Sequence, residues 1–456
     1  MSSSRGDTAK PTAALKDPSG NVRLILNLPS GDAPTDTCEA EVCTALVRLL
    51  DDAEVSIDFA VYGMRNQSTI FTALQRAKAR GVDIRGVVDR DAEGNNYYSS
   101  TETFVAALGT VHDDHTADIA RAKEKAKATT SYEPKCPRPE GFLGPVQCLA
   151  YDLGDNCLMA AHASRETLDG ADAIMHNKFF VVDNRFVWTG STNISDSGTG
   201  GYNANLVTVI DSRKIAKAYL DEMDQMFVKG RYHRAKKSNG TLRVALGNAD
   251  VELLFSPQDT PIRERVRPIL KAAKESVDVA VFFLTHKHIA ADLIKLHQKG
   301  VKVRVIIDAT AAKNGYTKHE LLRAAGIPVK VEDWGGKMHM KSAIIDGKIL
   351  VTGSMNWTTA GDDDNDENVV ILHSAELGEQ YAAYFEEIWG RIDDRWLVGA
   401  PDPESKDSGT ACSDGVDNDF DHQDDLADPG CGDSPPQLPA LPPYRLIPKQ
   451  QITCEW

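Results

Sequence analysis

The sequence contains no run of eighteen apolar residues, which excludes a transmembrane helix of ordinary length. Residues 1–20 are polar and rich in small side chains, and they lack the apolar stretch of a signal peptide. Long polybasic tracts are also missing, and the one short basic stretch, residues 231–237, is read as a solvated linker rather than a face for a polyanion. Two explanations stay open at this point: the chain is intracellular, or a leader has been removed.

The eight cysteines favour the second explanation. Most of them lie in loop-like contexts beside Pro, Gly or Asp, and an even number in loops is typical of disulfides in an oxidising compartment. We therefore expect a secreted or periplasmic protein, although a cytosolic protein with inert thiols would show the same count. The net charge of −16 is uneven, because twelve acidic and only three basic residues follow position 400.

Two stretches of the chain repeat one pattern. Residues 55–89 and 277–308 each read as an apolar β-branched run, an amphipathic helix, a Gly-Val pair and a second apolar run that ends in Asp. Residues 175–191 and 338–354 each predict a hairpin, followed by one more strand and a closing helix. The 456 residues therefore predict an α/β fold that is a tandem duplication of one mixed β-sheet flanked by helices, with pseudo-two-fold related halves.

The predicted boundaries follow from the repeat. From Asp89 to His176 is 87 positions, whereas from Asp308 to His339 is 31, so the first half carries an insertion. Such an insertion is either a lid or substrate-selecting loop, or a surface excursion stapled by a disulfide. We expect a disordered N-terminus at 1–21 and a first repeat at 22–230, with the insertion at 111–167. A linker at 231–248 leads to the second repeat at 249–397, and an Asp/Pro/Cys-rich tail follows at 398–456.

Each repeat carries the same polar motif. His176 and Lys178 precede Gly-Ser-x-Asn at 190–193, and His339 and Lys341 precede Gly-Ser-x-Asn at 353–356 with identical spacing. Positions i and i+2 of a strand share one face, so each histidine projects beside its lysine. Joining the halves would place two imidazoles, two ammonium groups and two amides around one pocket that suits a phosphodiester.

These paired motifs resemble the signature of the phospholipase D superfamily, and the resemblance covers nearly all of residues 22–395. It implies a two-step reaction through a phosphohistidine, with no metal or other cofactor for catalysis. It also implies that the lysines, Asn193 and Asn356 bind the non-bridging phosphate oxygens. One chain supplies both motifs, so a monomer is sufficient for one active site.

The resemblance also suggests which histidine does what. Glu367 lies 28 positions after His339 and resembles the family's carboxylate that holds a catalytic imidazole, so we expect His339 to be the general acid. The same count from His176 reaches Ala204, flanked by Asn203 and Asn205. A neutral His176, oriented by an amide or a backbone carbonyl, is then the expected nucleophile.

Other side chains have weaker signals. Asp183 and Asp346 lie seven positions after the histidines and should fix hairpin turns rather than do chemistry. Trp357 gives a Gly-Ser-x-Asn-Trp string that looks like the small nuclease branch, although core packing explains it equally well. Further candidates for contact with the substrate are Ser191, Ser354, Tyr62 and His286.

The acidic tail resembles EF-hand-like and thrombospondin-type calcium loops. His422 stands where glycine is expected, and Asp428 replaces the usual glutamate. Cys412 and Cys431 flank the loop, which favours a stapled structural calcium site over a disordered acidic tail. The expected ligands are Asp417, Asp419, Asp421, Gln423, Asp425 and Asp428.

The sequence thus predicts a metal-independent phosphodiester hydrolase. A nucleic-acid backbone is the first expected substrate class. A phospholipase D that hydrolyses or transfers lipid head groups is the alternative, and a catalytically inactive binding scaffold is a third hypothesis, which both intact His-Lys pairs argue against.

Overall fold

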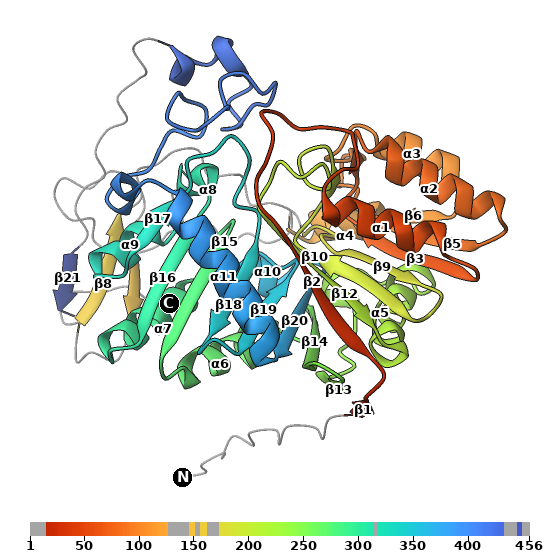
Figure 1. The fold of residues 1–456 in the computed structure, drawn as a ribbon, viewed down its shortest axis with the longest axis horizontal. Helices are drawn as coiled ribbons and strands as arrows, with labels where there is room; N and C mark the ends of the chain where they lie inside the picture. The colour runs from red at the N-terminus through yellow and green to blue at the C-terminus, as the bar shows by residue number, and fades with distance from the viewer. Residues whose placement is uncertain are drawn as a thin grey trace.

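The structure is a computed structural model that describes residues 15–125, 146–150, 156–161, 173–313, 317–432 and 445–448. Two large β-sheets lie side by side, and the chain completes most of the first before it builds the second (Figure 1). The described parts of the chain contain no helix long and apolar enough to span a bilayer.

The first half is a seven-stranded sheet with helices against it. Its strands, in spatial order, are β2 (Asn21–Asn27), β12 (Asn205–Asp211), β10 (Phe186–Gly190), β9 (Lys178–Val182), β3 (Ser56–Val61), β5 (Asp83–Val88) and β6 (Val111–Asp113). Its helices are α1 (Glu41–Asp51), α2 (Ser68–Ala79), α3 (Thr101–Leu108), α4 (His115–Lys125) and α5 (Arg213–Phe227). A short parallel pair, β4 (Met64–Arg65) and β11 (Ile194–Ser195), lies outside the sheet.

The second half is a nine-stranded sheet. Its strands, in spatial order, are β1 (Leu15–Asp17), β13 (Leu242–Leu246), β14 (Asp250–Ser256), β20 (Glu367–His373), β19 (Ile349–Gly353), β18 (Lys341–Ile345), β15 (Ser276–Val281), β16 (Lys302–Ile307) and β17 (Val329–Val331). Its α-helices are α6 (Arg267–Ala272), α7 (Lys287–Gln298), α8 (Ala309–Lys313), α9 (His319–Ala324), α10 (Thr359–Asp363) and α11 (Ala375–Arg391). Short helical turns are η1 (His233–Ala235), η2 (Ile262–Val266), η3 (Asp394–Leu397), η4 (Asp425–Ala427) and η5 (Pro429–Cys431).

The strand orders confirm the tandem duplication. From β2 to β6 the first sheet follows the same order and directions as the second does from β14 to β17. The β-branched runs of β3 and β15 are buried on both faces, as parallel neighbours covered by helices require. Gly81 and Gly300 follow α2 and α7 with φ of 89° and 88°, a left-handed conformation that suits a residue without a Cβ.

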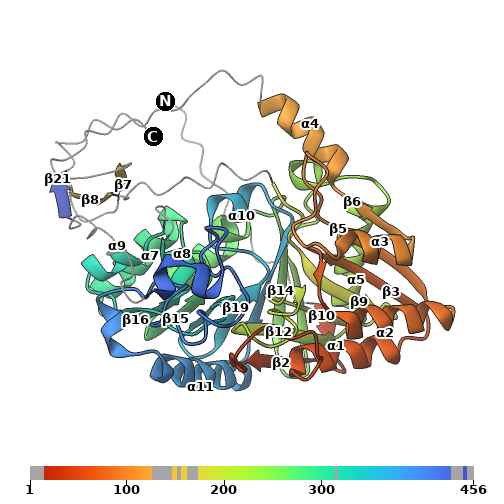
Figure 2. The same ribbon diagram turned by 90° about the horizontal axis from the view of Figure 1, so that it is seen from above.

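The halves share part of their core. One apolar cluster combines α5, with Tyr219 and Met223, and α11, with Tyr381 and Phe385, and this cluster lies between the two sheets. Separate clusters lie under α1 to α3 on the outer side of the first sheet and under α6 to α9 on that of the second. Figure 2 shows the two halves side by side, with these outer helices on either flank.

Three predicted boundaries need correction. The predicted disordered segment 1–21 contains β1, which pairs in parallel with β13, and the predicted linker 231–248 contains η1 and β13. β6 pairs with β5 as β17 does with β16, so Val111–Asp113 belongs to the repeat, and the extra residues of the first half begin after it. Short edge strands of three to five residues give too little periodicity to be separated from loops in the sequence.

The tail is folded against the second half as far as it is described. It lies beside α8 (Figure 1), where Lys313 pairs with Asp402 and Asp419, both at 2.5 Å. Disulfides join Cys38 to Cys43 and Cys412 to Cys431. A small three-stranded sheet combines β7 (Val146–Ala150) and β8 (Asn156–Ala161) of the insertion with β21 (Arg445–Pro448) of the tail.

Candidate active site

Both His-x-Lys motifs lie at equivalent edges of the two sheets. Lys178 opens β9 opposite Val61 at the end of β3, and Lys341 opens β18 opposite Val281 at the end of β15. Each histidine lies two residues earlier, where its strand approaches the other half. His176 and His339 are 6% and 8% exposed, so both side chains are almost completely buried.

Backbone hydrogen bonds lock the two motifs together across the halves. The N–H of His176 donates to the carbonyl of Asp366 at 2.9 Å, and the N–H of His339 donates to the carbonyl of Ala204 at 3.0 Å. Parallel bridges, Met175 with Asp366 and Met338 with Ala204, complete this symmetric exchange. One chain therefore brings both His-Lys pairs into one site, as the motif spacing predicted.

The partners of the two imidazoles differ from the prediction. Glu367 Oε2 lies 2.8 Å from Nδ1 of His176, not of His339. Nδ1 of His339 instead faces Oδ1 of Asn205 at 3.2 Å. Each imidazole is thus held by the opposite half, because β20 and β12 begin at the surface where the halves meet. The expected pairing of Glu367 with His339 is wrong.

A one-residue offset explains why counting failed. Gly190 pairs with Val207 and Gly353 with Val369, so the first half has one extra residue between its Gly-Ser-x-Asn motif and the next strand. Asn205, not Ala204, is therefore the equivalent of Glu367. At this position the two sites differ by an amide in place of a carboxylate.

The lysines lie beside the histidines and have unusual acidities. The ammonium of Lys178 donates to the carbonyl of His176 at 2.9 Å, and that of Lys341 to the carbonyl of His339 at 2.8 Å. Burial lowers the pKa of Lys178 to about 7 and, together with the neighbouring Lys178 ammonium, lowers the pKa of Lys341 well below its usual value. The unliganded pocket therefore lacks the negative charge that would keep both lysines protonated.

The other titratable groups respond to the same burial. The pKa of each of the two imidazoles is lowered well below its usual value by burial and by the two lysines. Burial raises the pKa of Glu367 to about 8, against the attraction of both lysines. An anion in the pocket would reverse the effect on the cationic groups, so the site is built for one negatively charged group.

The two asparagines of the motifs lie at the same pocket. Nδ2 of Asn193 donates to the hydroxyl of Tyr98 at 2.8 Å, a partner that the sequence analysis missed. The Oδ1 atoms of Asn193 and Asn356 are buried and have no hydrogen-bond partner among the described residues. These amides are thus available to a substrate after a rotation about their last bond.

The serines of the motifs, predicted to contact substrate, are engaged within the protein. The Ser191 hydroxyl donates to Oδ1 of Asn205 at 2.8 Å, and that of Ser354 accepts from the backbone N–H of Asn368 at 3.0 Å. Both side chains are fully buried. Ser191 therefore orients the amide that holds His339, which corrects its predicted role.

The candidates at the strand ends separate into two groups. The Tyr62 ring packs edge-on against His176 at 5.1 Å, and Phe282, its equivalent in the second half, lies 5.3 Å from His339. His286 is not part of this site, because its Nδ1 accepts from the N–H of Ile289 and caps α7. Trp357 is 1% exposed in the apolar core, so it gives no information about substrate.

Asp183 and Asp346 lie at the hairpin turns, far along the strands from the histidines, with φ of 52° and 51°. Carboxylate oxygens of Asp183 accept N–H groups of residues 54–56, and those of Asp346 accept N–H groups of residues 274–276. They connect each hairpin to the start of the neighbouring strand.

The tail carboxylates gather only in part. Oxygen atoms of Asp417, Asp419 and Asp421 lie within 4.8 Å of one another, and a second such group combines Asp419, Asp428 and Glu404, the last of which the sequence analysis missed. Asp425 instead accepts the N–H groups of Asp414 and Gly415, and Gln423 donates to Asp421. All oxygen donors suit a hard cation such as calcium.

His422 adopts φ of 73°, the turn that glycine usually makes at this position of a calcium loop. The replacement of the expected glycine by His422 therefore does not prevent this turn.

Known proteins share these features. Residues 46–227 and 266–389 match the family described as cardiolipin synthase, PLD-like domain. The mitochondrial cardiolipin hydrolase of Mus musculus is 37% identical over 137 residues, 30% of this chain and 62% of that protein. The one from Chlamydomonas reinhardtii is 30% identical over 196 residues, 38% of this chain and 86% of that protein. Nuc, a phospholipase D family member from Salmonella typhimurium, is 25% identical over 32% of this chain and 97% of its own, with a TM-score of 0.30.

The family match covers both halves and most of the chain, and it includes the residues that the structure gathers into one pocket. Two His-Lys pairs held in a single site are the chemical equipment of a phosphodiesterase and argue against an inactive scaffold. The match to the mouse relative spans only 62% of that protein's length. The family match over both halves shows that the chain belongs to the phospholipase D superfamily.

Proposed function

We propose that His176 is the nucleophile and His339 the general acid of a two-step hydrolysis. The observation that carries this assignment is the 2.8 Å contact between Glu367 and Nδ1 of His176. A carboxylate that accepts the Nδ1 proton leaves Nε2 free to attack phosphorus, and it stabilises the positive charge that the ring gains when the bond forms. The expected roles are kept, but the carboxylate supports the nucleophile rather than the acid.

In the first step the bond from Nε2 of His176 to phosphorus forms, the bond to the leaving oxygen breaks, and His339 gives its Nε2 proton to that oxygen. In the second step His339 takes a proton from water, the water oxygen attacks phosphorus, and the phosphorus–nitrogen bond breaks. Asn205 accepts the Nδ1 proton of His339 without holding a positive charge there, so the ring can release and recover its proton. Lys178 and Lys341 stabilise the non-bridging oxygens.

For the substrate, we propose the head-group phosphodiester of a phospholipid. The one short basic stretch of the sequence offers few free cations, because His233 and Lys236 are buried and the exposed Arg234 pairs with Asp364 at 2.9 Å. A long nucleic acid would need exposed cations along its backbone, whereas a head group presents one phosphodiester. Two of the relatives above are named cardiolipin hydrolases, which supports this choice.

A pocket near the catalytic site strengthens the same argument. It has a volume of about 490 Å³ and is lined by Arg65 of the first half and by the tail, with the carboxylates of Asp196, Asp414 and Asp417. The Arg65 guanidinium lies 5.4 Å from the Tyr98 ring, which contacts Asn193. Three carboxylates against one guanidinium repel a polyanion more than they repel a single phosphodiester.

Single-stranded nucleic acid, the substrate class first expected from the sequence, is the second candidate. Tyr62, Tyr97 and Tyr98 form a cluster with ring centroids 5.0 to 5.8 Å apart, and Tyr97 is 58% exposed. Exposed tyrosines of this kind stack on bases.

Turnover of cardiolipin and phosphatidylcholine vesicles should be compared with cleavage of an end-labelled single-stranded DNA, in EDTA, for the wild type and His176→Ala. We expect lipid head-group release in the wild type, none in the variant, and a phosphoenzyme on His176 after an alkaline quench, which preserves the phosphorus–nitrogen bond. DNA cleavage with inert lipids would favour the second candidate. Turnover by His176→Ala, or a phosphoenzyme on His339, would contradict the assigned roles.

We also propose a structural calcium ion in the tail and an extracytoplasmic location. The gathered carboxylates of Asp417, Asp419 and Asp421 and the disulfide between Cys412 and Cys431 support both. Calorimetry of the full chain with and without reductant tests the site: binding at millimolar calcium is expected only when the disulfide is intact. The absence of binding heat in the oxidised protein would leave the tail as an acidic surface.

A further inference from the structure

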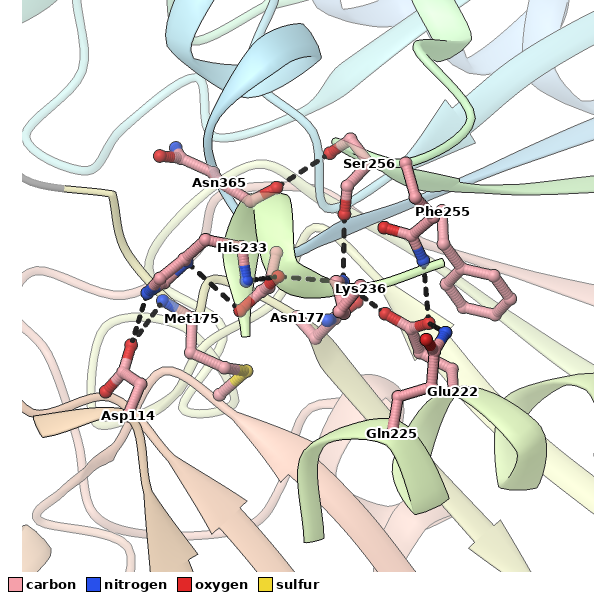
Figure 3. Close-up of polar contacts among 12 residues, drawn as sticks. Asp114, Met175, Asn177, Glu222, Gln225, His233, Lys236, Phe255, Ser256 and Asn365 are labelled. Carbon is pink, nitrogen blue, oxygen red and sulfur yellow. Dashed lines mark hydrogen bonds and ion pairs between the residues drawn. The ribbon is translucent and has the colours of Figure 1, made fainter. Parts of the chain in front are cut away.

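The stretch predicted to be a solvated linker instead enters the interior. His233 is 4% exposed, and its backbone has φ of 53°, an uncommon conformation for this residue type. Figure 3 shows its ring directed toward Asp114 and the Lys236 side chain directed toward Glu222. Both linker residues therefore lie among carboxylates that belong to other elements.

Carboxylates surround the His233 ring on both sides. Nε2 lies 3.0 Å from Asp118 and 3.4 Å from Asp114, whereas Nδ1 lies 3.2 Å from Asp366. The backbone N–H of His233 also donates to Asp366, at 2.8 Å. Despite its burial, the pKa of His233 is raised well above its usual value by these carboxylates. The ring thus joins the carboxylates of two segments, Asp114 and Asp118 at the start of α4 and Asp366 just before β20.

Two of these aspartates contact the backbone at Met175 and His176. The backbone carbonyl of Asp366 accepts the N–H of His176 at 2.9 Å, and the next residue is Glu367, which holds the imidazole. The N–H of Met175 donates to Asp89 at 2.8 Å and to Asp114 at 3.2 Å. His233 therefore ties together the strand that carries the nucleophile and the strand that carries its carboxylate.

Lys236 completes this cluster from the same linker. Its ammonium lies 2.8 Å from Asp366 and also contacts Glu222, and all three side chains are buried. Asp366 is thus held by two cations from one short stretch. This fixes the backbone at Glu367, because a shift of Asp366 would separate buried opposite charges.

The second site lacks this arrangement. The equivalent of Asp366 in the first half is Ala204, whose carbonyl accepts the N–H of His339 but whose methyl group can hold no cation. The second half has its own buried charged group, because Asp308 accepts the N–H of Met338 at 3.1 Å and Lys337 attracts both Asp308 and Glu332. What differs at Ala204 is that no side chain there can bind cations in the way that Asp366 binds His233 and Lys236.

We propose that His233 is a positioning residue that keeps Glu367 and His176 in register for attack on phosphorus. This inference rests on the proposed function of His176. His233→Gln removes the positive charge and leaves an amide that cannot satisfy carboxylates on both sides. Misplacement of the Glu367–His176 pair should slow the chemical step more than it weakens substrate binding.

The experiment is a double-mutant cycle on a soluble aryl phosphodiester, bis(4-nitrophenyl) phosphate. His233→Gln should lower kcat at least about tenfold and change KM less than about twofold, while in a Glu367→Gln background the same change should cost less than about twofold. Arg234→Gln is the matched control, because this neighbouring side chain is 71% exposed, and it should keep wild-type kinetics. If His233→Gln does not fold, Asp118→Asn should show the same non-additivity with a smaller loss.

An equal loss of kcat in both backgrounds would overturn the proposal, because it would mean that His233 acts only on folding. Unchanged kcat in His233→Gln would overturn it as well. A stoichiometric divalent metal in the wild type that His233→Gln loses would also overturn it, since Asp114, Asp118 and His233 would then be metal ligands. Failure of the proposed function is distinct: the wild type would be inactive, or His176→Ala active.

Discussion

When an oxyanion binds at pH 8, Lys178 by itself should take up close to one proton from solution. Burial lowers the pKa of Lys178 to about 7 in the free pocket, and it lowers that of Lys341 still further. A tungstate dianion between the two lysines supplies the missing negative charge. Both lysines should then regain their protons, so binding and protonation are coupled.

The size of this effect follows from the acidity of Lys178. At pH 8 a lysine of pKa about 7 is roughly one-tenth protonated, whereas an ordinary lysine is almost fully protonated, so Lys178 should take up about 0.9 proton. At pH 6 it is already about nine-tenths protonated, and its share should fall to about 0.1. Restoring an ordinary lysine pKa corresponds to roughly 5 kcal/mol of added interaction with the bound anion.

The same pKa shift also predicts how the stability of the free protein changes with pH. The folded pKa of Lys178 lies below its unfolded value of 10.5, so between pH 7 and 10.5 the unfolded chain binds more protons. This group therefore makes the unliganded protein more stable as the pH rises through that window, and tungstate should weaken the trend.

Calorimetry of tungstate binding in several buffers measures the proton uptake as the slope of apparent enthalpy against buffer ionisation enthalpy. Lys178→Met should reduce the uptake at pH 8 by about 0.9 proton. Lys217→Met is the control, because that side chain is 72% exposed on α5. An uptake below about 0.3 proton at pH 8, or one that Lys178→Met leaves unchanged, would refute the reasoning.

Three further outcomes are expected. Glu367→Gln should lower kcat about 100-fold and reduce the yield of phosphorylated His176, measured by phosphopeptide mapping after an alkaline quench; a loss of less than about threefold would contradict its role. Tyr98→Phe should raise KM several-fold with kcat nearly unchanged in steady-state assays, because the Asn193 amide loses the hydroxyl that orients it. A fall in kcat with unchanged KM would instead place Tyr98 in the chemical step. Asp419→Asn should remove any rise in melting temperature caused by calcium, and a full rise in that variant would exclude Asp419 as a ligand.

The fold could be predicted because the same pattern of strands and helices occurs twice in the sequence. The β-branched runs at residues 56–61 and 276–281 are buried on both faces in the structure. The His-x-Lys strands have the predicted side-by-side placement of histidine and lysine. Periodicity of this kind records local burial, and local burial was enough to fix the order of the main strands.

The residues that hold the imidazoles could not be predicted in the same way. A fixed count from each histidine assumes that a motif is completed within its own half, whereas Glu367 and Asn205 each reach across to the other half. The single extra residue in the first half also shifts the equivalence from Ala204 to Asn205. Contacts between distant strands depend on how the halves dock, which periodicity does not record.

The linker was misread for a related reason. A short run that contains Arg231, Arg234 and Lys237 has the composition of a solvated surface, and in isolation that interpretation is reasonable. His233 and Lys236 lie inside because Asp114, Asp118, Asp366 and Glu222, which come from distant positions, provide buried charge of opposite sign. The sequence contains the cations and the carboxylates but not their proximity.

The duplication and its exceptions together explain how one pocket obtains two different histidines. Both halves supply the same strands, lysines and Gly-Ser-x-Asn motifs, so the scaffold alone would give two equivalent imidazoles. Two adjacent positions break the equivalence: Glu367 stands against Asn205, and Asp366 stands against Ala204. The first substitution gives His176 a carboxylate, and the second gives that carboxylate's strand a buried anchor. The proposed nucleophile and the proposed acid are thus distinguished by two neighbouring positions on a duplicated framework.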